Sequence, residues 1–288
     1  MVSKDITTTQ KQWDLSIRPQ RSWWDLRLGE LWRYRDLIWL FVRRDFVAYY
    51  KQTILGPLWY VIQPVVTTLV FTVIFGNIAK LPTDGLPPFL FYLAGTTVWS
   101  YFSSVLTSTS NTFTSNAGIF GKVYFPRLCI PLSVVISNFI SFGIRFGLFL
   151  AMLVYFMLAG SSIHPNLWIL LLPVMLLIMA GIALGAGIVI SSLTTKYRDL
   201  QYLVSFGVQL LMYGTPVIYP ISTVQGIWRW LILVNPITPV IETFRLAFLG
   251  TGTLSPIYLL YSIAFMLVIL CIGVLVFNRV ESNFMDTV

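Results

Sequence analysis

Long apolar stretches recur along the chain and constrain its fold more than any other feature. Residues 57–78 carry no charge, and five similar stretches follow at about 86–108, 128–158, 167–193, 200–218 and 256–277. A membrane-spanning helix needs about 20 mainly apolar residues, so each stretch is interpreted as one span. Charged residues make up 10% of the chain, against roughly 25% in a soluble domain. The sequence therefore predicts an all-α integral membrane protein with six transmembrane helices.

An amphipathic stretch, residues 31–53, precedes the first span. At helical spacing its basic residues share one narrow face, and most of its apolar residues share the other. The basic residues of that face are Arg33, Arg43, Arg44 and Lys51. No uncharged window here is long enough to cross a bilayer, so we expect an interface helix along the membrane surface. A helix packed on a soluble core is the alternative, which the apolar neighbours disfavour.

Two short apolar segments, 228–234 and 240–249, separate the fifth and sixth spans. Each is too short to cross, and Asn235-Pro236 and Pro239 lie between them. These segments favour two re-entrant helices that enter and leave one leaflet.

The basic residues indicate the orientation. Six spans place both termini on one side, and the excess of basic residues before the first span predicts that this side is cytoplasmic. Residues 1–30 are then a polar cytoplasmic extension, and 54–288 form the transmembrane domain. The loops near 111–127 and 195–199 face the cytoplasm as well.

The sequence lacks the motifs that several classes of protein need for their function. No G-x-x-x-x-G-K-[ST] phosphate loop is present, so this chain is not expected to hydrolyse ATP. His164 and the two cysteines have no metal-ligand spacing, and no metal or cofactor is expected in the chain. A chain this apolar is not expected to bind nucleic acid. A membrane enzyme acting on a lipid-linked sugar needs an acid, base or nucleophile cluster, which the sequence does not offer.

The loop before the third span is the most specific local signal. Its residues are Gly118, Lys122, Val123, Tyr124, Phe125, Pro126 and Arg127. Pro126 would end a short helix or begin the next one, and such a helix suits the groove of a partner protein. The alternative is that Lys122 and Arg127 only maintain the positive-inside orientation.

Aromatic side chains in and beside the spans are candidates for lining a pore. The candidates are Trp59, Tyr60, Tyr92, Trp99, Tyr101, Tyr213 and Tyr219. An interfacial belt facing lipid is the alternative for each. Arg145 lies deep in the third span, where an isolated charge is costly. We expect it to face protein, water or an anionic substrate group, or to snorkel to an interface. Glu242 and Arg245 are three residues apart, which fits either a local ion pair or a gate contact.

Five motifs occur in order along nearly the whole chain. They are Leu55-Gly-Pro-Leu-Trp-Tyr-Val-Ile-Gln-Pro64, Lys122-Val-Tyr-Phe-Pro-Arg127, Tyr197-Arg-Asp199 with Arg198 at its centre, Thr215-Pro-Val-Ile-Tyr219, and Asn235-Pro236-Ile-Thr-Pro239 followed by Arg245. Together they resemble the permease subunits of ABC-2 type polysaccharide exporters, the O-antigen, capsule and teichoic-acid group.

The resemblance implies a homodimer in the bacterial inner membrane, with two ATPase subunits that bind ATP and magnesium. It implies that 31–51 is a cytoplasmic interface helix and that 116–127 is an ATPase-coupling loop. Tyr197, Arg198 and Asp199 then belong to a second cytoplasmic loop. The segment 228–249, with Asn235 and Pro236, would surround the outer gate. The implied cargo is a glycan on a polyprenyl-pyrophosphate lipid. A drug or lipid cargo remains the alternative within the same class.

Overall fold

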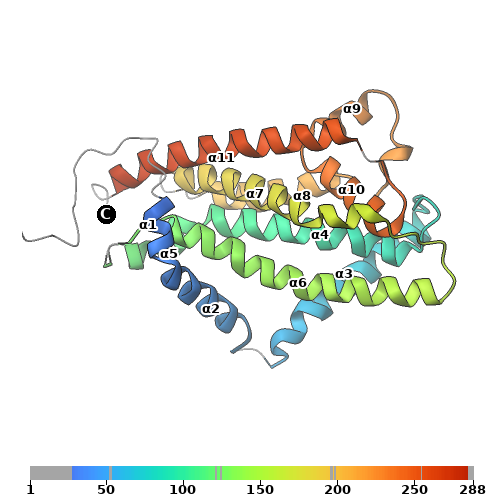
Figure 1. The fold of residues 1–288 in the computed structure, drawn as a ribbon, viewed down its shortest axis with the longest axis horizontal. Coiled ribbons are helices and arrows are strands. Elements are labelled where there is room, and N and C mark those ends of the chain that lie inside the picture. The colour runs from blue at the N-terminus through green and yellow to red at the C-terminus, as the bar shows by residue number, and fades with distance from the viewer. Residues whose placement is uncertain are drawn as a thin grey trace, which may run out of the picture.

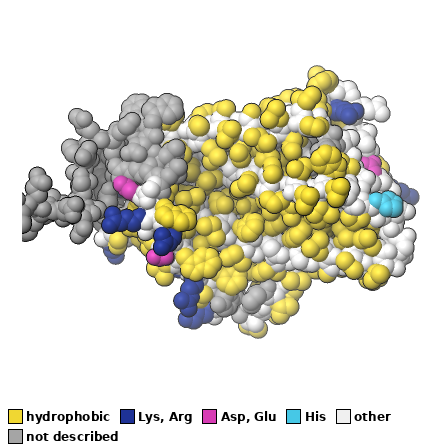
Figure 2. Space-filling view, viewed as in Figure 1, with side chains coloured by type: hydrophobic (Ala, Val, Ile, Leu, Met, Phe, Trp, Pro, Cys, Tyr) yellow, Lys and Arg dark blue, Asp and Glu magenta, His cyan; other side chains and the backbone are white. Residues whose placement is uncertain are grey.

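The structure is a computed structural model that describes residues 28–51, 54–120, 122–123, 125–194, 197, 199–253 and 255–284. Every regular element in these residues is helical, and the long helices run side by side as one elongated bundle (Figure 1). Hydrophobic side chains cover the visible middle of the bundle, whereas charged side chains lie towards its ends (Figure 2). This distribution fits an all-helical membrane protein.

The elements follow the expected order. The first part of the chain forms α1 (Leu28–Arg33), α2 (Arg35–Lys51), η1 (Gly56–Leu58), α3 (Trp59–Phe71), the π-helix η2 (Thr72–Ile78), α4 (Pro88–Ser110), α5 (Thr112–Phe120) and α6 (Cys129–Leu158). The second part forms η3 (Leu167–Leu171), α7 (Leu172–Thr194), α8 (Leu200–Tyr213), η4 (Ile221–Thr223), α9 (Gly226–Val234), α10 (Thr238–Leu249) and α11 (Pro256–Phe284). We call the end that carries α1, α2 and α5 the proximal end, and the end that carries α9 the distal end.

Five helices within the described residues are long and apolar enough to cross a membrane. They are Trp59–Ile78, Pro88–Ser110, Cys129–Leu158, Leu167–Thr194 and Pro256–Arg279. The pair α9 and α10, bent by 94° at its break, brings the number to six if the pair counts as one span. The prediction of an all-α membrane protein is therefore confirmed, with five to six spanning helices.

The predicted fifth span is shorter than expected. Helix α8 has 14 residues and is therefore only about 21 Å long, against roughly 30 Å for a hydrocarbon core. It ends at Tyr213 because Gly214 and Thr215 precede Pro216, and a residue before proline is disfavoured in the helical conformation. The next residues form a turn in which Val217 N donates to Thr215 O at 2.6 Å.

Helix α4 forms the centre of the bundle, and its apolar residues from Leu90 to Leu106 are almost completely buried. Helix α7 packs between α4 and α11 at very short range. A Cβ atom added at Gly185 would lie 2.8 Å from the backbone of Ile269 in α11, and one added at Gly273 would lie 2.8 Å from Gly185 O. Small residues here let two helical backbones approach, as expected for apolar helices that associate in lipid.

Candidate functional site

A cavity of about 740 Å³ lies among α3, α4, α6 and α8 and reaches the end of α2. Most of its lining residues are polar or aromatic, although the surrounding helices are largely apolar. Its lining comprises Asp45, Phe46, Tyr60, Gln63, Trp99, Ser103, Ser104, Thr107, Ser108, Val134, Ser137, Asn138, Ser141, Arg145, Ser205, Val208, Gln209 and Met212. We call this space the central cavity.

Helical periodicity builds the polar lining. On α6, residues 134, 137, 138, 141 and 145 recur at intervals of three and four, so they share one face. Residues 205, 208, 209 and 212 do the same on α8. Each helix therefore turns one polar stripe inward and leaves its apolar sides to neighbouring helices or lipid.

Many of these side chains donate to carbonyls of their own helix. Ser141 Oγ donates to Ser137 O at 3.2 Å, Asn138 Nδ2 to Val134 O at 2.8 Å, and Ser205 Oγ to Gln201 O at 3.1 Å. Such bonds satisfy the donor within the helix and leave the acceptor oxygens of the hydroxyl and amide groups for other partners. The cavity is therefore suited to water or to a ligand rich in hydroxyl groups.

The predicted pore residues separate into three groups. Tyr60, Trp99 and Arg145 all line the central cavity, although they come from three different helices. Trp59 and Tyr213 are exposed on the bundle surface, and the Tyr219 hydroxyl donates to Tyr213 O at 3.0 Å in the distal turn.

Tyr92 and Tyr101 form the third group, which lies in the hydrophobic core of the bundle. Tyr92 packs edge-on against Phe91 and Phe71, with ring centroids 5.5 and 6.3 Å away, and Tyr101 packs on Phe142 at 5.5 Å. Neither tyrosine lines the central cavity.

Sequence reasoning missed most of the polar lining. Gln63, Asn138 and Gln209 lie in three separate apolar spans, where each looked like an isolated polar residue. Marking every Ser, Thr, Asn and Gln at intervals of three and four within the spans would have found the stripes on α6 and α8. Asp45 is an acidic residue among the apolar residues of 31–51, and it also lines the cavity.

Aromatic side chains hold the proximal end together. Phe125 packs between Phe41 of α2 and Phe120 of α5, with ring centroids 5.7 and 5.8 Å away. The same cluster includes Phe113 and Phe277, whose rings stack at 4.9 Å. Helix α2, the loop before α6, and α5 therefore pack as one unit against the ends of α6, α7 and α11.

The residues of the predicted coupling loop have different environments. Gly118, Lys122 and Val123 are exposed at the proximal end, Phe125 is buried, and Pro126 O accepts a hydrogen bond from Cys129 N at the start of α6. Arg127 is only 5% exposed, and its guanidinium lies 5.4 Å from the centre of the Phe120 ring. Tyr124 lies outside the described residues. Among the described residues between α5 and α6, Lys122 and Val123 are therefore the exposed ones.

Hydrogen bonds join α5 to the helices behind it. Gln201 Nε2 at the start of α8 donates to Thr114 Oγ1 at 2.8 Å, and Phe113 N donates to Ser191 Oγ of α7 at 3.2 Å. In the second predicted loop, Tyr197 and Asp199 are exposed next to α8, and Arg198 lies outside the described residues. A displacement of α5 would therefore act on α8, which lines the central cavity.

The basic residues of the predicted interface helix, Arg33, Arg43, Arg44 and Lys51, are all exposed. Helix α2 also buries Phe41 and Val42, and Phe46 stacks on Tyr60 of α3 with ring centroids 6.4 Å apart. Helix α2 therefore contacts both the aromatic cluster and the wall of the central cavity.

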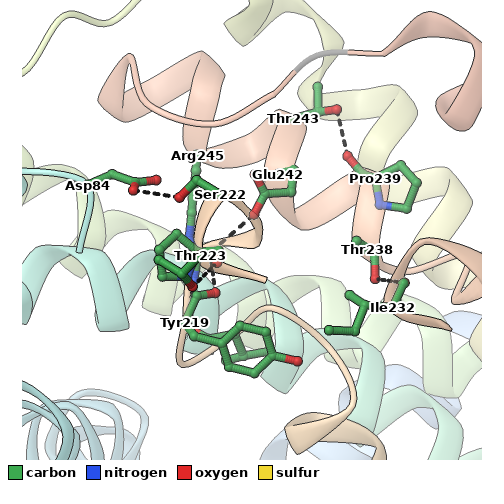
Figure 3. A network of polar contacts seen from close by, with 12 residues as sticks. Asp84, Tyr219, Ser222, Thr223, Ile232, Thr238, Pro239, Glu242, Thr243 and Arg245 are labelled. Atoms are coloured by element: carbon green, nitrogen blue, oxygen red, sulfur yellow. Dashed lines mark hydrogen bonds and ion pairs between the residues drawn. The ribbon is translucent and has the colours of Figure 1, made fainter. Parts of the chain in front are cut away.

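A buried polar network lies at the distal end (Figure 3). Arg245 is 1% exposed, and its Nη1 lies 3.5 Å from Glu242 Oε1. Its Nη2 donates to Val217 O at 2.6 Å, and its guanidinium lies 3.9 Å from the centre of the Phe91 ring. The Glu242 carboxylate also accepts backbone hydrogen bonds from Ile221 and Thr253. The pair therefore ties α10 to α4 and to two distal loops.

Asn235 and Pro236 join the helix pair to its neighbours. Asn235 Nδ2 donates to Thr215 Oγ1 at 2.8 Å, and its Oδ1 accepts from Ile237 N at 3.0 Å. Pro236 O accepts from Ser262 Oγ of α11 at 2.7 Å. Nearby, Ser222 Oγ donates to Asp84 Oδ1 at 2.8 Å, as Figure 3 also shows.

The fold and the central cavity define a multi-pass membrane protein with a polar space inside an apolar helical bundle. Residues 36–249 match the family model described as ABC-2 type transporter, and the chain belongs to this family.

Curated relatives cover most of the chain. An O-antigen export system permease protein RfbA of Klebsiella pneumoniae is 28% identical over 87% of this chain and 94% of its own length. Another protein of that name, from Myxococcus xanthus, is 29% identical over 76% of this chain and 82% of its own. The polysialic acid transport protein KpsM of Escherichia coli is 25% identical over 79% of this chain and 86% of its own.

Proposed function

We propose that this chain is the transmembrane permease subunit of an ATP-driven exporter that moves a lipid-linked polysaccharide of the O-antigen type across the bacterial inner membrane. The observation that carries the proposal is the central cavity, where hydroxyl, amide and aromatic groups line a space within the membrane-spanning helices. The names of the relatives above support a polysaccharide as cargo.

The lining suits a sugar chain that must move. Trp99 and Tyr60 offer ring faces for the C–H faces of sugars, and such contacts tolerate sliding because they are weakly directional. Serine and threonine hydroxyls and the amides of Gln63 and Gln209 exchange hydrogen bonds with sugar hydroxyls or water. Since many similar groups are spread along the cavity, successive sugar units find equivalent partners.

Arg145 is the contact that we assign to the anionic part of the cargo. Its side chain lines the central cavity from α6. A cation at membrane depth strongly favours a bound anion, because the low-dielectric surroundings strengthen the attraction. We assign it to the pyrophosphate that joins glycan and lipid.

The working assembly in this proposal is a homodimer with two ATPase subunits, which bind ATP and magnesium. Both termini are cytoplasmic, so the proximal end meets the ATPase through Lys122, Val123 and the loop at 197–199. The basic face of α2 lies along the cytoplasmic membrane surface. Helices α9 and α10 are re-entrant and form the outer gate.

Two substitutions at Arg145 test the anion contact. In a strain that lacks the chromosomal gene, we expect Arg145→Gln to lower surface polysaccharide at least roughly tenfold, the effect of losing about 1.4 kcal/mol of binding. Arg145→Lys retains the charge and should keep a large share of export. Equal export by the two variants, with equal amounts of protein in the membrane, would contradict the assignment.

A blocking substitution tests the cavity itself. Ser141→Trp places an indole in the central cavity, whereas Phe139→Trp alters an exposed site on the same helix. We expect the first to stop export and the second to leave it near the wild-type level, measured as polysaccharide on the cell surface. If deleting the gene leaves surface polysaccharide unchanged, the proposed cargo is wrong.

A further inference from the structure

A second cavity, of about 480 Å³, lies at the distal end among α9, α10 and the start of α11. This volume is within the range of small-molecule binding pockets. Its lining comprises Ile221, Gly226, Arg229, Trp230, Leu233, Thr238, Pro239, Glu242, Thr253, Ser255 and Tyr258. We call it the distal pocket, and it shares no lining residue with the central cavity.

Helix α9 turns one face towards the distal pocket. Its lining residues, 226, 229, 230 and 233, follow the three-and-four spacing of one helical face. The other face carries Ile227, Trp228, Leu231 and Val234, all of which are well exposed. Trp228 and Trp230 are equally exposed, at 68% and 66%, yet only Trp230 lines the pocket.

The wall opposite α9 carries a carboxylate that is fixed in place. Glu242 is 3% exposed and is held by Arg245 and by the backbone of Ile221 and Thr253. Because Arg245 balances its charge, this carboxylate is suited to accepting hydrogen bonds from neutral hydroxyl groups more than to attracting a cation. The Thr238 hydroxyl already donates to Ile232 O at 2.7 Å.

Hydrogen-bonding groups and aromatic rings line the distal pocket together with this carboxylate. Arg229 supplies guanidinium donors, and Ser255 and Tyr258 supply hydroxyl groups. Trp230 and Tyr258 supply two ring systems. A ligand that matches this set has an apolar face for stacking and several hydroxyl groups at its edge, which is the chemistry of a pyranose ring.

We propose that the distal pocket is a saccharide-binding site that takes one pyranose unit of the exported glycan as the chain leaves the bundle. This inference rests on the proposed function, since it takes the cargo to be a polysaccharide. The site lies between α9 and α10, so an occupied pocket would also fix the positions of these two helices relative to each other.

The two tryptophans of α9 provide a matched test. The complex of this chain with its ATPase subunit is placed in nanodiscs and titrated with the host's own surface polysaccharide, released from its lipid and separated by size. Binding is measured by saturation-transfer NMR and by calorimetry. We expect Trp230→Ala to weaken binding about five- to tenfold, as for the loss of one aromatic stacking contact. Trp228→Ala should bind like the wild type, and Trp230→Phe should retain most of the affinity.

The results that would contradict the saccharide site differ from those that would contradict the proposed function. Equal binding by the Trp230→Ala and Trp228→Ala variants would overturn the saccharide site while leaving the proposed export function intact. A phospholipid headgroup held in the pocket, detected by mass spectrometry and displaced by no saccharide, would overturn it as well. Absence of both export and glycan binding in the wild-type complex would instead contradict the proposed function.

Discussion

Arg245 shows how one residue joins distant segments of this chain. Its guanidinium contacts Glu242 on its own helix, Val217 O in the turn after α8, and the Phe91 ring of α4. Spacing predicted only the local pair with Glu242. The contacts with α4 and with the turn help to hold α10 inside the bundle, because a buried cation is costly without a charge partner and hydrogen-bond acceptors.

Replacing Arg245 should therefore destabilise the protein strongly. We expect Arg245→Met to reduce the free energy of unfolding by about 3–5 kcal/mol, because Glu242 would keep a buried charge without its partner. The measurement is thermal unfolding of purified protein in detergent. Arg229→Met, at an exposed site on α9, is the control and should change stability by less than about 0.5 kcal/mol. Similar losses in both variants would contradict the structural role of Arg245.

The aromatic residues show where residue-level prediction reached its limit. Tyr60 and Trp99 line the central cavity, whereas Tyr92 and Tyr101 are enclosed in the core. All four lie in or beside apolar spans and have similar chemistry. A span that is apolar on every side carries no periodic signal of which face is buried, so only packing against the other helices separates the two pairs.

At the scale of helices, the contact between α7 and α11 depends on glycine. Gly185 lies so close to Ile269 that a side chain there would press against backbone, which cannot rotate away. Gly143 on α6 has no neighbouring atom within 4 Å of an added Cβ. Replacing each glycine by alanine therefore separates two effects on stability. Both changes raise helix propensity, but only the change at Gly185 disturbs helix packing.

We expect Gly185→Ala to lower the free energy of unfolding by about 1–3 kcal/mol, the usual cost of overpacking. Gly143→Ala should be neutral or should stabilise the helix by up to about 1 kcal/mol, because alanine is the better helix former. Unfolding of both variants in the same detergent checks the difference. A Gly185→Ala protein as stable as the wild type would show that α7 and α11 can move apart at little cost.

The loop before α6 places its two basic residues in different environments. Lys122 and Val123 are exposed, whereas Arg127 is buried against Phe120. Lys122 and Arg127 looked equivalent in the sequence, since both are basic residues flanking one short motif. In the fold, Arg127 packs internally and Lys122 stays exposed.

Charge reversal should therefore have different effects at the two positions. We expect Lys122→Glu to leave thermal stability unchanged and to weaken association with the ATPase subunit, measured by co-purification. Arg127→Glu should lower the stability of the isolated chain by more than about 1 kcal/mol, because it buries an acidic group beside an aromatic cluster. If Lys122→Glu co-purifies with the ATPase as well as the wild type does, the loop is not the coupling contact.

At the scale of the whole molecule, a series of side-chain contacts links the proximal end to the central cavity. Phe125 joins α2 and α5, Gln201 joins α5 and α8, and α8 forms one wall of the cavity. A movement imposed on the proximal loops can thus reach the cavity through packed side chains and hydrogen bonds. Such a connection is what an ATP-driven permease requires.

ATP hydrolysis and subunit composition test the proposed assembly. The purified chain should show no ATP hydrolysis, whereas co-expression with an ATPase subunit should yield a stable complex containing two copies of each protein. Native mass spectrometry measures the composition, and phosphate release measures hydrolysis. Hydrolysis by the chain alone would contradict its assignment as a transport subunit, and a complex with one copy of this chain would contradict the homodimer.

The sequence by itself determined the class of this protein. Apolar length and the scarcity of charge predict spanning helices from local physics alone, because each span must satisfy its backbone hydrogen bonds internally. The motifs from Leu55 to Arg245 indicated the family, and the match to residues 36–249 confirms it. Only the tertiary structure decided which polar residues share a cavity, why α8 lines it, and why Arg127 and Arg245 are buried. Those outcomes depend on how helices far apart in the chain pack together, which no local pattern encodes.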